Sequence, residues 1–569
     1  MQRPFFSHHP HRSFLSIFSP ATLLALLLPL FLLVSCGPST ETIVVGGEAR
    51  GPEITEDDDE APGEREPRLA VLKIGESNRI QSMDPLFALN TATKRMIQFA
   101  YEGLVRFDHE DAIVPAAARR WQVSDDSLTW TFQLRRDLFF HDDESFAQGR
   151  GRRVNSRDVV RVFERMASRD VPSNAADLFM NTIQGFEPFY LEQREVYLTR
   201  DRQVTSISGV EATSDSTVAF RLLQPDKNFL AKLASPHAVL YPSEPFRFRD
   251  EGLHRHAVGT GPFRYESSIG DTIHVFLRHA HYYGRDQQDR RLPLVSRVEL
   301  MNVTDETRLF NHFQRGRLNA IVDAGPLTID RISGGDVGLE GDADTSHEAG
   351  RDSGREHGNE TGTEAGTEVG VKNDGTDAFE SFRLERLPNQ DPVVLRYHTR
   401  NRFGLDRSDA ASVIRHTTPE RIALEWFDPS LTITFKEEAF TQSNIGRVFR
   451  RFGEDSEHRL VLAFNQDQLP RMLAKVITES MDANLQRVMA QRRVFSSDIF
   501  LYLDYLQSVV PGTVHERHPE ELMRIETDRY LLLDHSVEGI RTNSLSWWMD
   551  LRQVRLTESA RQPEALMEW

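Results

Sequence analysis

The sequence is poor in cysteine: Cys36 is the only one among 569 residues. A single cysteine excludes an intrachain disulfide, a multi-cysteine zinc site and an iron–sulfur cluster. Basic residues are also in deficit, with 68 Lys and Arg against 86 Asp and Glu, and the formal net charge is −18. Nucleic acid is therefore not an expected partner, because neutralising phosphates requires a surplus of positive charge. The length predicts roughly two to four globular domains or lobes.

Signatures of common enzymes are missing too. The sequence holds no HExxH, GxSxG or GxxxxGK[ST] motif. His515 and His518 are three residues apart, one short of the HExxH spacing, and the acidic residues 142–144 beside His141 are interpreted as a loop rather than a cation site. No nucleophile, base and orienting group are placed together by the sequence. We therefore expect a protein that is not an enzyme and has no metal or cofactor.

The longest apolar run, residues 21–33, is too short for a membrane-spanning helix, which needs about 20 residues. Arg3 and Arg12 precede this run, and a basic flank before a short apolar stretch is typical of an export signal. The run ends in LVSCG, which resembles the lipobox of bacterial lipoproteins and places Cys36 at the acylated position. We expect residues 1–35 to be a signal peptide and the protein to be lipid-anchored in the cell envelope, facing the periplasm. The alternative is an ordinary buried or free cysteine.

Two segments have compositions that disfavour a folded core. Residues 36–67 are acidic and contain no aromatic residue, so we predict a disordered tether. Residues 334–377 include the low-complexity stretch GNETGTEAGTEVG and also contain no aromatic residue. This second segment is predicted to be a disordered insertion within a folded lobe.

The remaining sequence alternates between strand and helix patterns. Period-two or continuous apolar patterns predict strands at 68–74, 128–134, 215–223 and 460–464. Helical spacing of apolar residues predicts helices at 93–104, 156–166 and 473–485. The interleaving of the two patterns indicates an α/β fold.

Several passages together resemble the family 5 extracellular solute-binding proteins, the receptors of peptide and nickel ABC importers. The matching passages are MDP at 83–85, YEGLVRF at 101–107, the stretch 114–135, FHD at 140–142, NSRDVV at 155–160 and GTGPF at 259–263. They follow the family order from residue 68 to 322, and the resemblance resumes from 460 to 556. The closing segment, residues 536–556, resembles the part of the family that returns to the first lobe.

Several motif residues are interpreted structurally. Gly259 and Gly261, on either side of a threonine, predict a tight turn that needs the backbone freedom of glycine. Trp121 and Trp130 are interpreted as apolar anchors of a small lobe. His141 is interpreted as a residue that fixes its loop.

The resemblance implies a periplasmic binding protein-like fold of type II, with two lobes, a hinge and an extra subdomain in the first lobe. The expected layout is lobe I at 68–290, lobe II at 291–525 with the insertion 334–377, a return to lobe I at 526–557 and a tail at 558–569. Ligand would be enclosed between the lobes as they close about the hinge.

The resemblance also implies ligand-binding residues. In the peptide receptors a tryptophan is followed three residues later by an aspartate that pairs with the ligand amine. Here Asp504 matches the aspartate, whereas Leu501 replaces the tryptophan. Tyr505 and Tyr101 are further candidates for ligand contact. The sequence also departs from the family where Asn319 takes an acidic position, with Asp323 four residues further on, and where the helix around 409–422 is barely recognisable.

The resulting expectation is a monomeric, lipid-anchored receptor that binds an oligopeptide or a similar polar solute and delivers it to an ABC permease. The alternative is a lipoprotein scaffold that keeps the fold but has lost transport. The departures in the second lobe motivate this alternative.

Overall fold

The computed structural model describes residues 70–332 apart from 271, and 382–387, 389, 391–398, 410, 431–435, 460–465, 467–479, 485–489, 501–508 and 510–557. The predictions for Cys36, the tether at 36–67, the insertion at 334–377 and most of 409–422 lie outside these residues.

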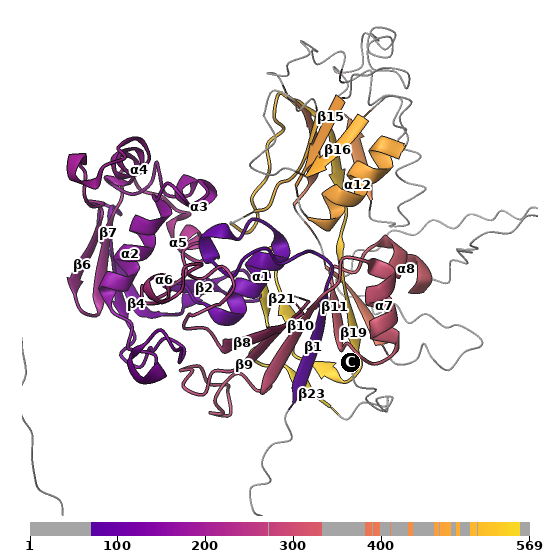
Figure 1. The fold of residues 1–569 in the computed structure, drawn as a ribbon, viewed down its shortest axis with the longest axis horizontal. Helices are drawn as coiled ribbons and strands as arrows, with labels where there is room; N and C mark the ends of the chain where they lie inside the picture. The colour runs from indigo at the N-terminus through magenta and orange to yellow at the C-terminus, as the bar shows by residue number, and fades with distance from the viewer. Residues whose placement is uncertain are drawn as a thin grey trace, which may run out of the picture. The chain divides into compact units, whose positions relative to one another are not determined.

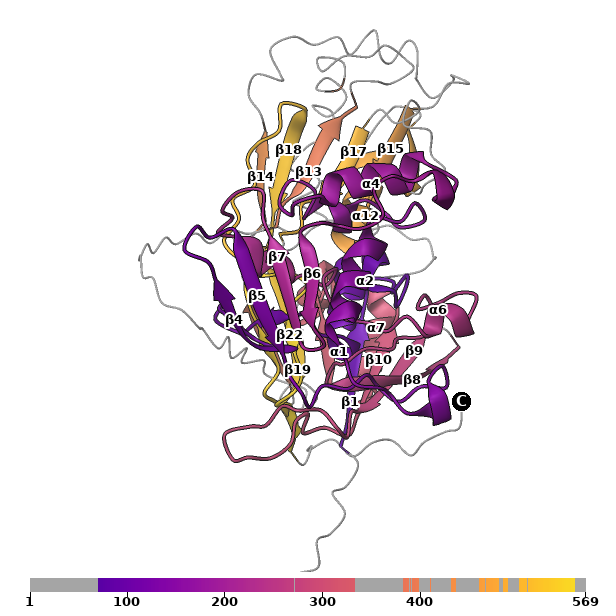
Figure 2. The ribbon, with the colours of Figure 1, turned by 90° about the vertical axis from the view of Figure 1, so that its left-hand side faces the viewer.

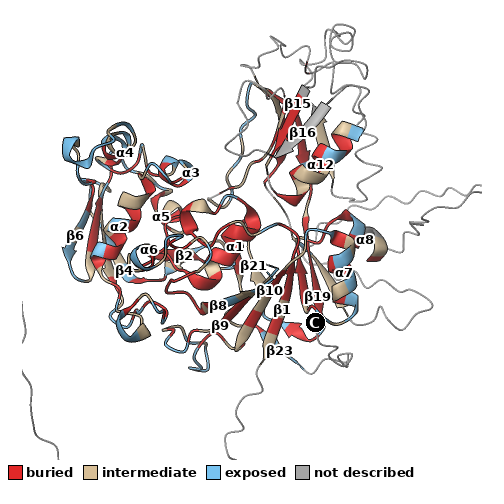
Figure 3. Ribbon diagram, viewed as in Figure 1, coloured by how far each residue is buried: buried red, intermediate tan, exposed pale blue. Residues whose placement is uncertain are grey.

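A seven-stranded mixed sheet is the centre of the first lobe (Figure 1). In spatial order its strands are β12 (Phe382–Leu387), β19 (Arg529–Asp534), β11 (Ala320–Val322), β1 (Val71–Glu76), β10 (Arg297–Asn302), β9 (Ile273–Arg278) and β8 (Phe263–Ile269). Central β1 is parallel to both of its neighbours, and the outer pairs are antiparallel. Figure 3 shows buried residues along these strands.

Successive side chains of each strand point to opposite faces of this sheet, and helices cover the apolar side chains on both faces. On β19, Leu531 and Leu533 belong to the core that includes α1 (Thr91–Ala100). Leu532 belongs instead to the core with α7 (Glu306–Gln314) and α8 (Pro326–Ile332). The seven-stranded sheet is therefore the middle layer of a three-layer arrangement.

A four-stranded antiparallel sheet forms the inserted part of the first lobe, visible in Figure 2. Its strands are β4 (Ala118–Val123), β5 (Thr129–Leu134), β7 (Thr217–Arg221) and β6 (Val210–Ser214), and α2 (Ser156–Met166) packs on it. Asn155 and Asp158 form a capping box that starts α2. Phe220 packs edge-to-face on both Phe132 of β5 and Phe163 of α2, with ring centroids 5.7 and 5.0 Å apart, which ties helix to sheet.

Short helices complete this region. They are α3 (Asn174–Asp177), α4 (Phe186–Glu195), α5 (Phe229–Leu233) and α6 (Pro245–Phe248). The hairpin of β2 (Val105–Phe107) and β3 (Ile113–Pro115) lies between α1 and β4 in the chain.

A six-stranded sheet forms the second lobe (Figure 2). Its order is β14 (Thr432–Phe435), β18 (Glu521–Glu526), β13 (Val393–Tyr397), β17 (Leu501–Tyr505), β15 (Leu460–Phe464) and β16 (Leu485–Met489). Helix α12 (Gln468–Glu479) follows β15, and its apolar residues share one core with β15 and β17.

Two short connections join the sheets: one runs from β12 to β13, and the other from β18 to β19. We call these two connections the hinge. The Asn389 side chain spans them, donating to the Thr527 carbonyl at 3.1 Å and to the Asp391 carbonyl at 3.2 Å. A second tie is the ion pair between Arg386 of β12 and Asp528. The hinge is therefore cross-braced by polar side chains.

The closing segment returns to the first lobe after β19. It contains β20 (Val537–Glu538), β21 (Arg541–Thr542), β22 (Met549–Asp550) and β23 (Arg555–Leu556), which form two small antiparallel pairs. Trp547 is buried against Phe107 of β2, and its carbonyl accepts a hydrogen bond from Gln98 of α1 at 2.8 Å. The closing segment thus packs against β2 and α1 of the first lobe.

Most predicted elements are confirmed, with shifted ends. The helix predicted at 156–166 matches α2, and the strand predicted at 460–464 matches β15. The helix predicted at 473–485 is wrong at both ends, because α12 spans Gln468–Glu479 and Leu485 begins β16. Apolar residues at 473, 477, 481 and 485 keep a four-residue spacing past the end of α12, so the pattern alone does not mark the boundary.

The interpretation of the GTGP turn needs a correction. Gly259 and Gly261 do not have left-handed backbone angles. A Cβ on Gly259 would lie 2.1 Å from the Ala100 carbonyl oxygen, and one on Gly261 would lie 2.5 Å from the Ala100 carbonyl carbon. Glycine is needed here because the turn lies directly against the end of α1. His141 holds the same turn, with its Nε2 2.9 Å from the Gly261 carbonyl oxygen, which confirms its loop-fixing role.

Candidate functional site

A cavity of about 70 Å³ lies between the two lobes at the hinge. It is lined by residues of the first lobe, the second lobe and the hinge itself, including Asn78, Thr91, Asp323, Asp467, Tyr505 and Arg529. A cavity needs roughly 10–15 Å³ to hold one water molecule, so this one has room for only a few. We call it the interlobe pocket.

Asp467 of the second lobe reaches the first lobe at this pocket. Its Oδ1 accepts hydrogen bonds from the Thr91 backbone N at 3.0 Å and from the Thr91 Oγ1 at 2.7 Å. Its Oδ2 accepts from Gln507 at 2.7 Å. Asp467 directly precedes α12 and contacts the first residue of α1, so a carboxylate lies at the N-termini of two helices, where negative charge is favoured.

The local electrostatics show the cost of burying these charges. Burial raises the pKa of Asp467, although the Thr91 hydrogen bonds and nearby Lys94 oppose the change. Burial likewise lowers the pKa of Lys94, against the attraction of Asp467. Lys94 is held by Gln507 of the second lobe, which adds another polar contact between the lobes.

A second pair of contacts joins the same surfaces. The Gln468 backbone N donates to the Asn78 side-chain oxygen, and the Ser77 hydroxyl donates to the Gln468 side-chain oxygen. All three of these residues are buried. The N-terminus of α12 is therefore fixed against the loop after β1 as well as against α1.

A buried charge network forms the first-lobe wall of the pocket. Arg95 of α1 pairs with Glu76 at the end of β1 and with Asp323, whose Oδ2 lies 2.6 Å from Nη2. Burial raises the pKa of Glu76 to about 7, outweighing the attraction of Arg95. The neighbouring carboxylates and burial act oppositely on Arg95, and the net effect raises its pKa. Two ionised carboxylates on one guanidinium leave a net negative charge, and the raised pKa of Glu76 reduces that charge near neutral pH.

Arg529 starts β19 and extends the network into the hinge. Its Nη1 donates to the Ser546 carbonyl at 2.8 Å and lies 3.6 Å from Asp323 Oδ1. Its Nε and Nη2 are buried and have no hydrogen-bond partner within the described part of the chain. Among the described residues that line the pocket, Arg529 is the only basic one.

The predicted ligand residues of β17 lie on opposite faces of the strand. Tyr505 lines the interlobe pocket, and its hydroxyl is 3.3 Å from the Asn389 side-chain nitrogen. Asp504 points to the other face, where it pairs with Arg396 of β13 and does not line this pocket. Burial raises the pKa of Asp504, against the attraction of Arg396. A ligand amine at Asp504 would have to compete with Arg396.

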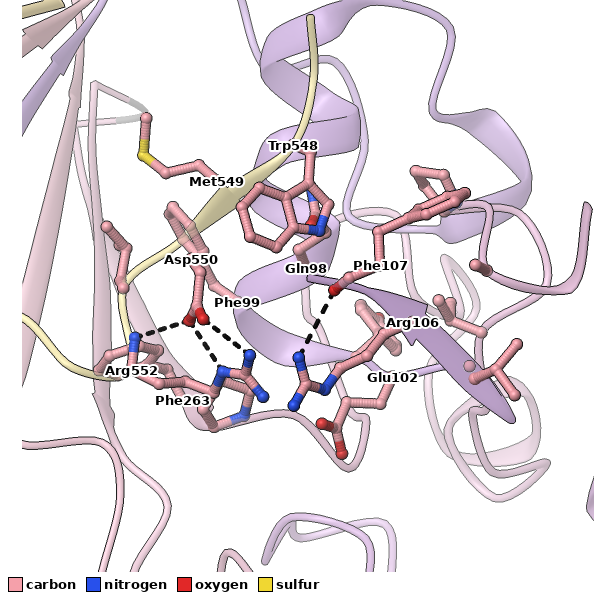
Figure 4. Close-up of a pocket in the computed structure, with 18 residues that line it drawn as sticks. Gln98, Phe99, Glu102, Arg106, Phe107, Phe263, Trp548, Met549, Asp550 and Arg552 are labelled. Carbon is pink, nitrogen blue, oxygen red and sulfur yellow. Dashed lines mark hydrogen bonds and ion pairs between the residues drawn. The ribbon is translucent and has the colours of Figure 1, made fainter. Parts of the chain in front are cut away.

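The third predicted residue, Tyr101, lies at a different cavity of about 60 Å³, shown in Figure 4. The Tyr101 hydroxyl donates to the Met83 carbonyl at 3.0 Å, and the side chain is buried. The cavity is walled by the first lobe and the closing segment, including Glu102, Arg106 and Arg552. Because no described residue of the second lobe lines it, lobe closure would not enclose a ligand there.

Ser508, His515 and Asp391 meet beside the hinge, which invites comparison with a hydrolase triad. The Ser508 hydroxyl and Asp391 Oδ1 both face Nε2 of His515, at 2.8 and 3.5 Å. A catalytic histidine instead uses one ring nitrogen for the nucleophile and the other for the carboxylate. Asp391 Oδ1 also accepts from the Ser508 backbone N at 2.9 Å, so these residues brace the hinge.

Sequence reasoning missed the residues that join the lobes. Asp467 and Gln468 lie in the connection from strand β15 to α12, and polar residues at the carboxyl end of a parallel strand are a known signal for a site. Arg529 carried no comparable local signal. Within the described residues, no cluster of three His, Cys, Asp or Glu side chains is suited to a metal ion, and no helix has the length and apolar character to cross a membrane.

Solved structures define the class of fold. The murein tripeptide binding protein MppA of Escherichia coli matches with a TM-score of 0.59 and 12% identity, covering 86% of this chain and 98% of that one. The periplasmic binding protein DppA from Helicobacter pylori, in complex with the peptide STSA, matches with a TM-score of 0.58 and 12% identity over 85% of this chain and 98% of that one. These likenesses confirm the periplasmic binding protein fold of type II.

Sequence comparisons match the same family over part of the chain. Residues 112–347 match the family model for bacterial extracellular solute-binding proteins, family 5 Middle. Heme-binding protein A of Haemophilus influenzae is 29% identical over 232 residues, which are 40% of this chain and 38% of that protein. The peptide transport periplasmic protein SapA of Salmonella typhimurium is 32% identical over 157 residues, 27% of this chain and 26% of that protein. The chain thus matches well under half the length of these relatives. The motif-based prediction is confirmed: the chain carries the middle region of a family 5 solute-binding protein.

Proposed function

We propose that the protein is the solute-binding component of an ABC importer, and that it encloses a peptide or a similar polar solute between the lobes by hinge closure, at the interlobe pocket, which widens to admit the solute. The observation that carries this proposal is that one pocket is lined by the first lobe, the second lobe and the hinge together. Ligand contacts made to both lobes at once favour the closed form over the open form. The names of relatives include peptide-binding and heme-binding proteins, which guides the choice of test solutes.

The proposal includes the anchoring expected from the sequence and a two-lobed layout with a different boundary. The first lobe would include β10, β11 and β12, which share the seven-stranded sheet with β1, so the boundary would lie at the hinge and not at residue 290 as the sequence analysis expected. The second lobe would be built on the six-stranded sheet, and the chain would return to the first lobe at β19. Cys36 would carry the lipid that holds the receptor at the membrane, beside its permease. Mass spectrometry of the membrane-bound protein should find an acylated N-terminal Cys36, and the Cys36→Ser variant should be released in soluble form.

The function is tested with the chain starting at residue 36 and carrying Cys36→Ser. Thermal unfolding and small-angle scattering are measured with mixed di- and tripeptides, heme and nickel–histidine. Binding should raise the thermal midpoint and reduce the radius of gyration, because closure joins the lobes. The absence of both effects with every solute would contradict the proposal.

A second candidate function is the scaffold that keeps the fold without transport. The small volume of the pocket favours it, since drug-sized ligands occupy pockets of roughly 300–1,000 Å³ and this one has about 70 Å³. The direct hydrogen bonds from Thr91 to Asp467 favour it as well, because these groups of the two lobes already bind each other. A ligand-free protein that stays compact in solution, and does not respond to solutes, would support this second function.

A further inference from the structure

Arginines gather at one end of the seven-stranded sheet, the end at which β1 begins. The carbonyl of Ala70, just before β1, accepts from the backbone N atoms of Ser296 and Arg297 at 3.1 and 3.3 Å. The connection from β9 to β10 therefore lies at this end (Figure 1). The link from α7 to β11 lies there too, because the Asn319 backbone N donates to the Lys73 carbonyl at 2.8 Å. We call this part of the first lobe the arginine-rich end.

The arginine-rich end is opposite in charge to the whole chain. Residues 278–297 contain five arginines and two aspartates, and residues 309–322 contain two arginines and no acid, whereas the chain has a net charge of −18. The exposed arginines of these two segments are Arg285, Arg290, Arg291, Arg315 and Arg317. Burial lowers the pKa of His312 on α7, and the positive charges of Arg317, Arg315 and Arg308 lower it further. Positive charge is thus concentrated on one part of an acidic protein.

Acidic side chains neutralise only part of this charge. Three of the arginines pair with acids, and the pairs are Arg285–Asp289, Arg290–Asp286 and Arg297–Glu299. Arg278, Arg291 and Arg315 make no ion pair with any residue that the structure describes. Arg278 Nη2 donates to the Arg291 carbonyl at 2.8 Å, and Arg291 Nη1 donates to the Ala280 carbonyl at 2.6 Å. These bonds to carbonyls hold two guanidiniums in place without neutralising them.

The arrangement suits an extended anionic surface better than a single small anion. The arginines come from two separate connections, and none of them lines the interlobe pocket or the cavity at Tyr101. They spread over an exposed end of the lobe instead of converging on one point.

We propose that the arginine-rich end docks on the anionic phospholipid headgroups of the membrane that carries the protein. A guanidinium donates two parallel hydrogen bonds to phosphate oxygens, and clustered basic residues are attracted to an anionic membrane surface. The described part of the chain begins at this end, so the lipid proposed at Cys36 would be attached through it. This inference concerns a second surface and does not depend on solute binding.

Docking would determine the orientation of the receptor. Glu76 lies at the other end of β1 and belongs to the wall of the interlobe pocket. A strand of six residues is about 20 Å long, so the length of the sheet separates the pocket from the docked end. The docked receptor would present its pocket away from the membrane, toward arriving solute, and delivery to the permease would require release from the headgroups.

Vesicle binding tests the proposal on the chain starting at residue 36 with Cys36→Ser, because without the lipid only the protein surface can hold a vesicle. Co-sedimentation is measured with vesicles of phosphatidylcholine alone and of phosphatidylcholine with about one third phosphatidylglycerol. We expect at least roughly tenfold stronger binding to the anionic vesicles at about 0.05 M salt, and loss of this binding at about 0.5 M salt, where exposed charges are screened.

Variants test whether the arginine-rich end is responsible. Arg291→Gln combined with Arg315→Gln should weaken binding to anionic vesicles roughly 30-fold, since each arginine near the surface contributes about fivefold. Arg200→Gln combined with Arg221→Gln is the matched control, because it changes the net charge equally at exposed residues of the inserted part of the lobe. The control should bind like the parent protein. Arg291→Lys combined with Arg315→Lys keeps both charges and should keep most of the binding.

The outcomes separate this surface from the interlobe pocket. Equal binding to neutral and anionic vesicles, or binding to neither, would overturn the docking and leave the solute-binding function intact. An equal loss in the control variant would show that net charge alone determines binding, and would also overturn the proposal. Solute-induced thermal shifts of the Arg291→Gln, Arg315→Gln protein should match those of the parent. The comparison of vesicles needs no variant, so it holds even where this protein does not fold.

Discussion

Removing the Asp467 carboxylate should loosen the contact between the lobes. In Asp467→Ala, the Thr91 backbone N and hydroxyl lose their shared acceptor across the lobe boundary. A hydrogen bond to a charged group contributes about 1.5–3 kcal/mol, and the buried carboxylate offsets part of this through its desolvation. We therefore expect the free energy that favours contact between the lobes to fall by about 2–3 kcal/mol. This lowers the equilibrium constant for joined over separated lobes by roughly 30- to 150-fold.

Small-angle scattering of the ligand-free protein measures this change directly. If the lobes are mostly joined in the parent protein, Asp467→Ala should increase the radius of gyration, and it should weaken the apparent affinity for a solute in proportion to the fall in the fraction of molecules with joined lobes. Asp467→Asn keeps one acceptor oxygen for Thr91 and should show a smaller effect.

Asp305 provides a matched control, because it caps α7 within the first lobe by accepting from the Arg308 N at 2.9 Å. Asp305→Ala should cost about 1 kcal/mol of stability without changing the radius of gyration. The reasoning would be refuted by an Asp467→Ala protein with an unchanged radius and unchanged solute affinity.

Two further predictions concern stability. Gly261→Ala should destabilise the first lobe by about 3 kcal/mol or more, because its Cβ would lie 2.5–2.7 Å from backbone atoms of residues 99–101. Gly316→Ala, which meets nothing within 4 Å, should cost only about 1–2 kcal/mol for its left-handed backbone; similar urea midpoints for the two would contradict this. Burial lowers the pKa of both His237 and His279 to about 4. Between about pH 6.5, the unfolded pKa, and about pH 4, the unfolded state binds a proton that the folded state does not. The free energy of unfolding is therefore highest above about pH 6.5 and falls by about 1.4 kcal/mol per pH unit per histidine as the pH drops toward 4. Urea unfolding of His279→Gln should show a shallower loss on acidification, and an unchanged slope would count against the explanation.

The local patterns predicted the elements well where one physical signal dominated. Residues 128–134 alternate strictly, and β5 covers Thr129–Leu134. The helix at 156–166 was predicted from its amphipathic pattern, and the structure adds Asn155 as its cap. The boundary after α12 was missed because apolar spacing continues across it into β16.

The glycines of the GTGP turn show a different limit. Their presence correctly indicated a place where a side chain is not tolerated, but the reason was a close approach rather than a left-handed angle. A close approach depends on a partner 159 positions away in the chain, since Ala100 contacts Gly259, and a local pattern holds no information about it.

The interlobe residues were harder still to predict. Thr91 and Asp467 are 376 positions apart, and neither belongs to a recognisable catalytic or metal-binding motif. Asp504 was favoured instead because its spacing matches the family, and its role in binding an amine stays a prediction. In the structure Asp504 pairs with Arg396, whereas its neighbour Tyr505 faces the interlobe pocket.

Helix α1 connects the GTGP turn, which the sequence motifs indicated, to the interlobe pocket, which the structure revealed. Its last residue, Ala100, is fixed against the GTGP turn, and its first residue, Thr91, meets Asp467 at the interlobe pocket. A helix of ten residues is about 15 Å long and resists bending, so the position of its end determines the position of its start. Arg95, near the middle, adds Glu76 and Asp323 to the same rigid element. The first-lobe half of the pocket is thus positioned by the core of that lobe, and hinge motion would bring the second-lobe half to a preformed surface.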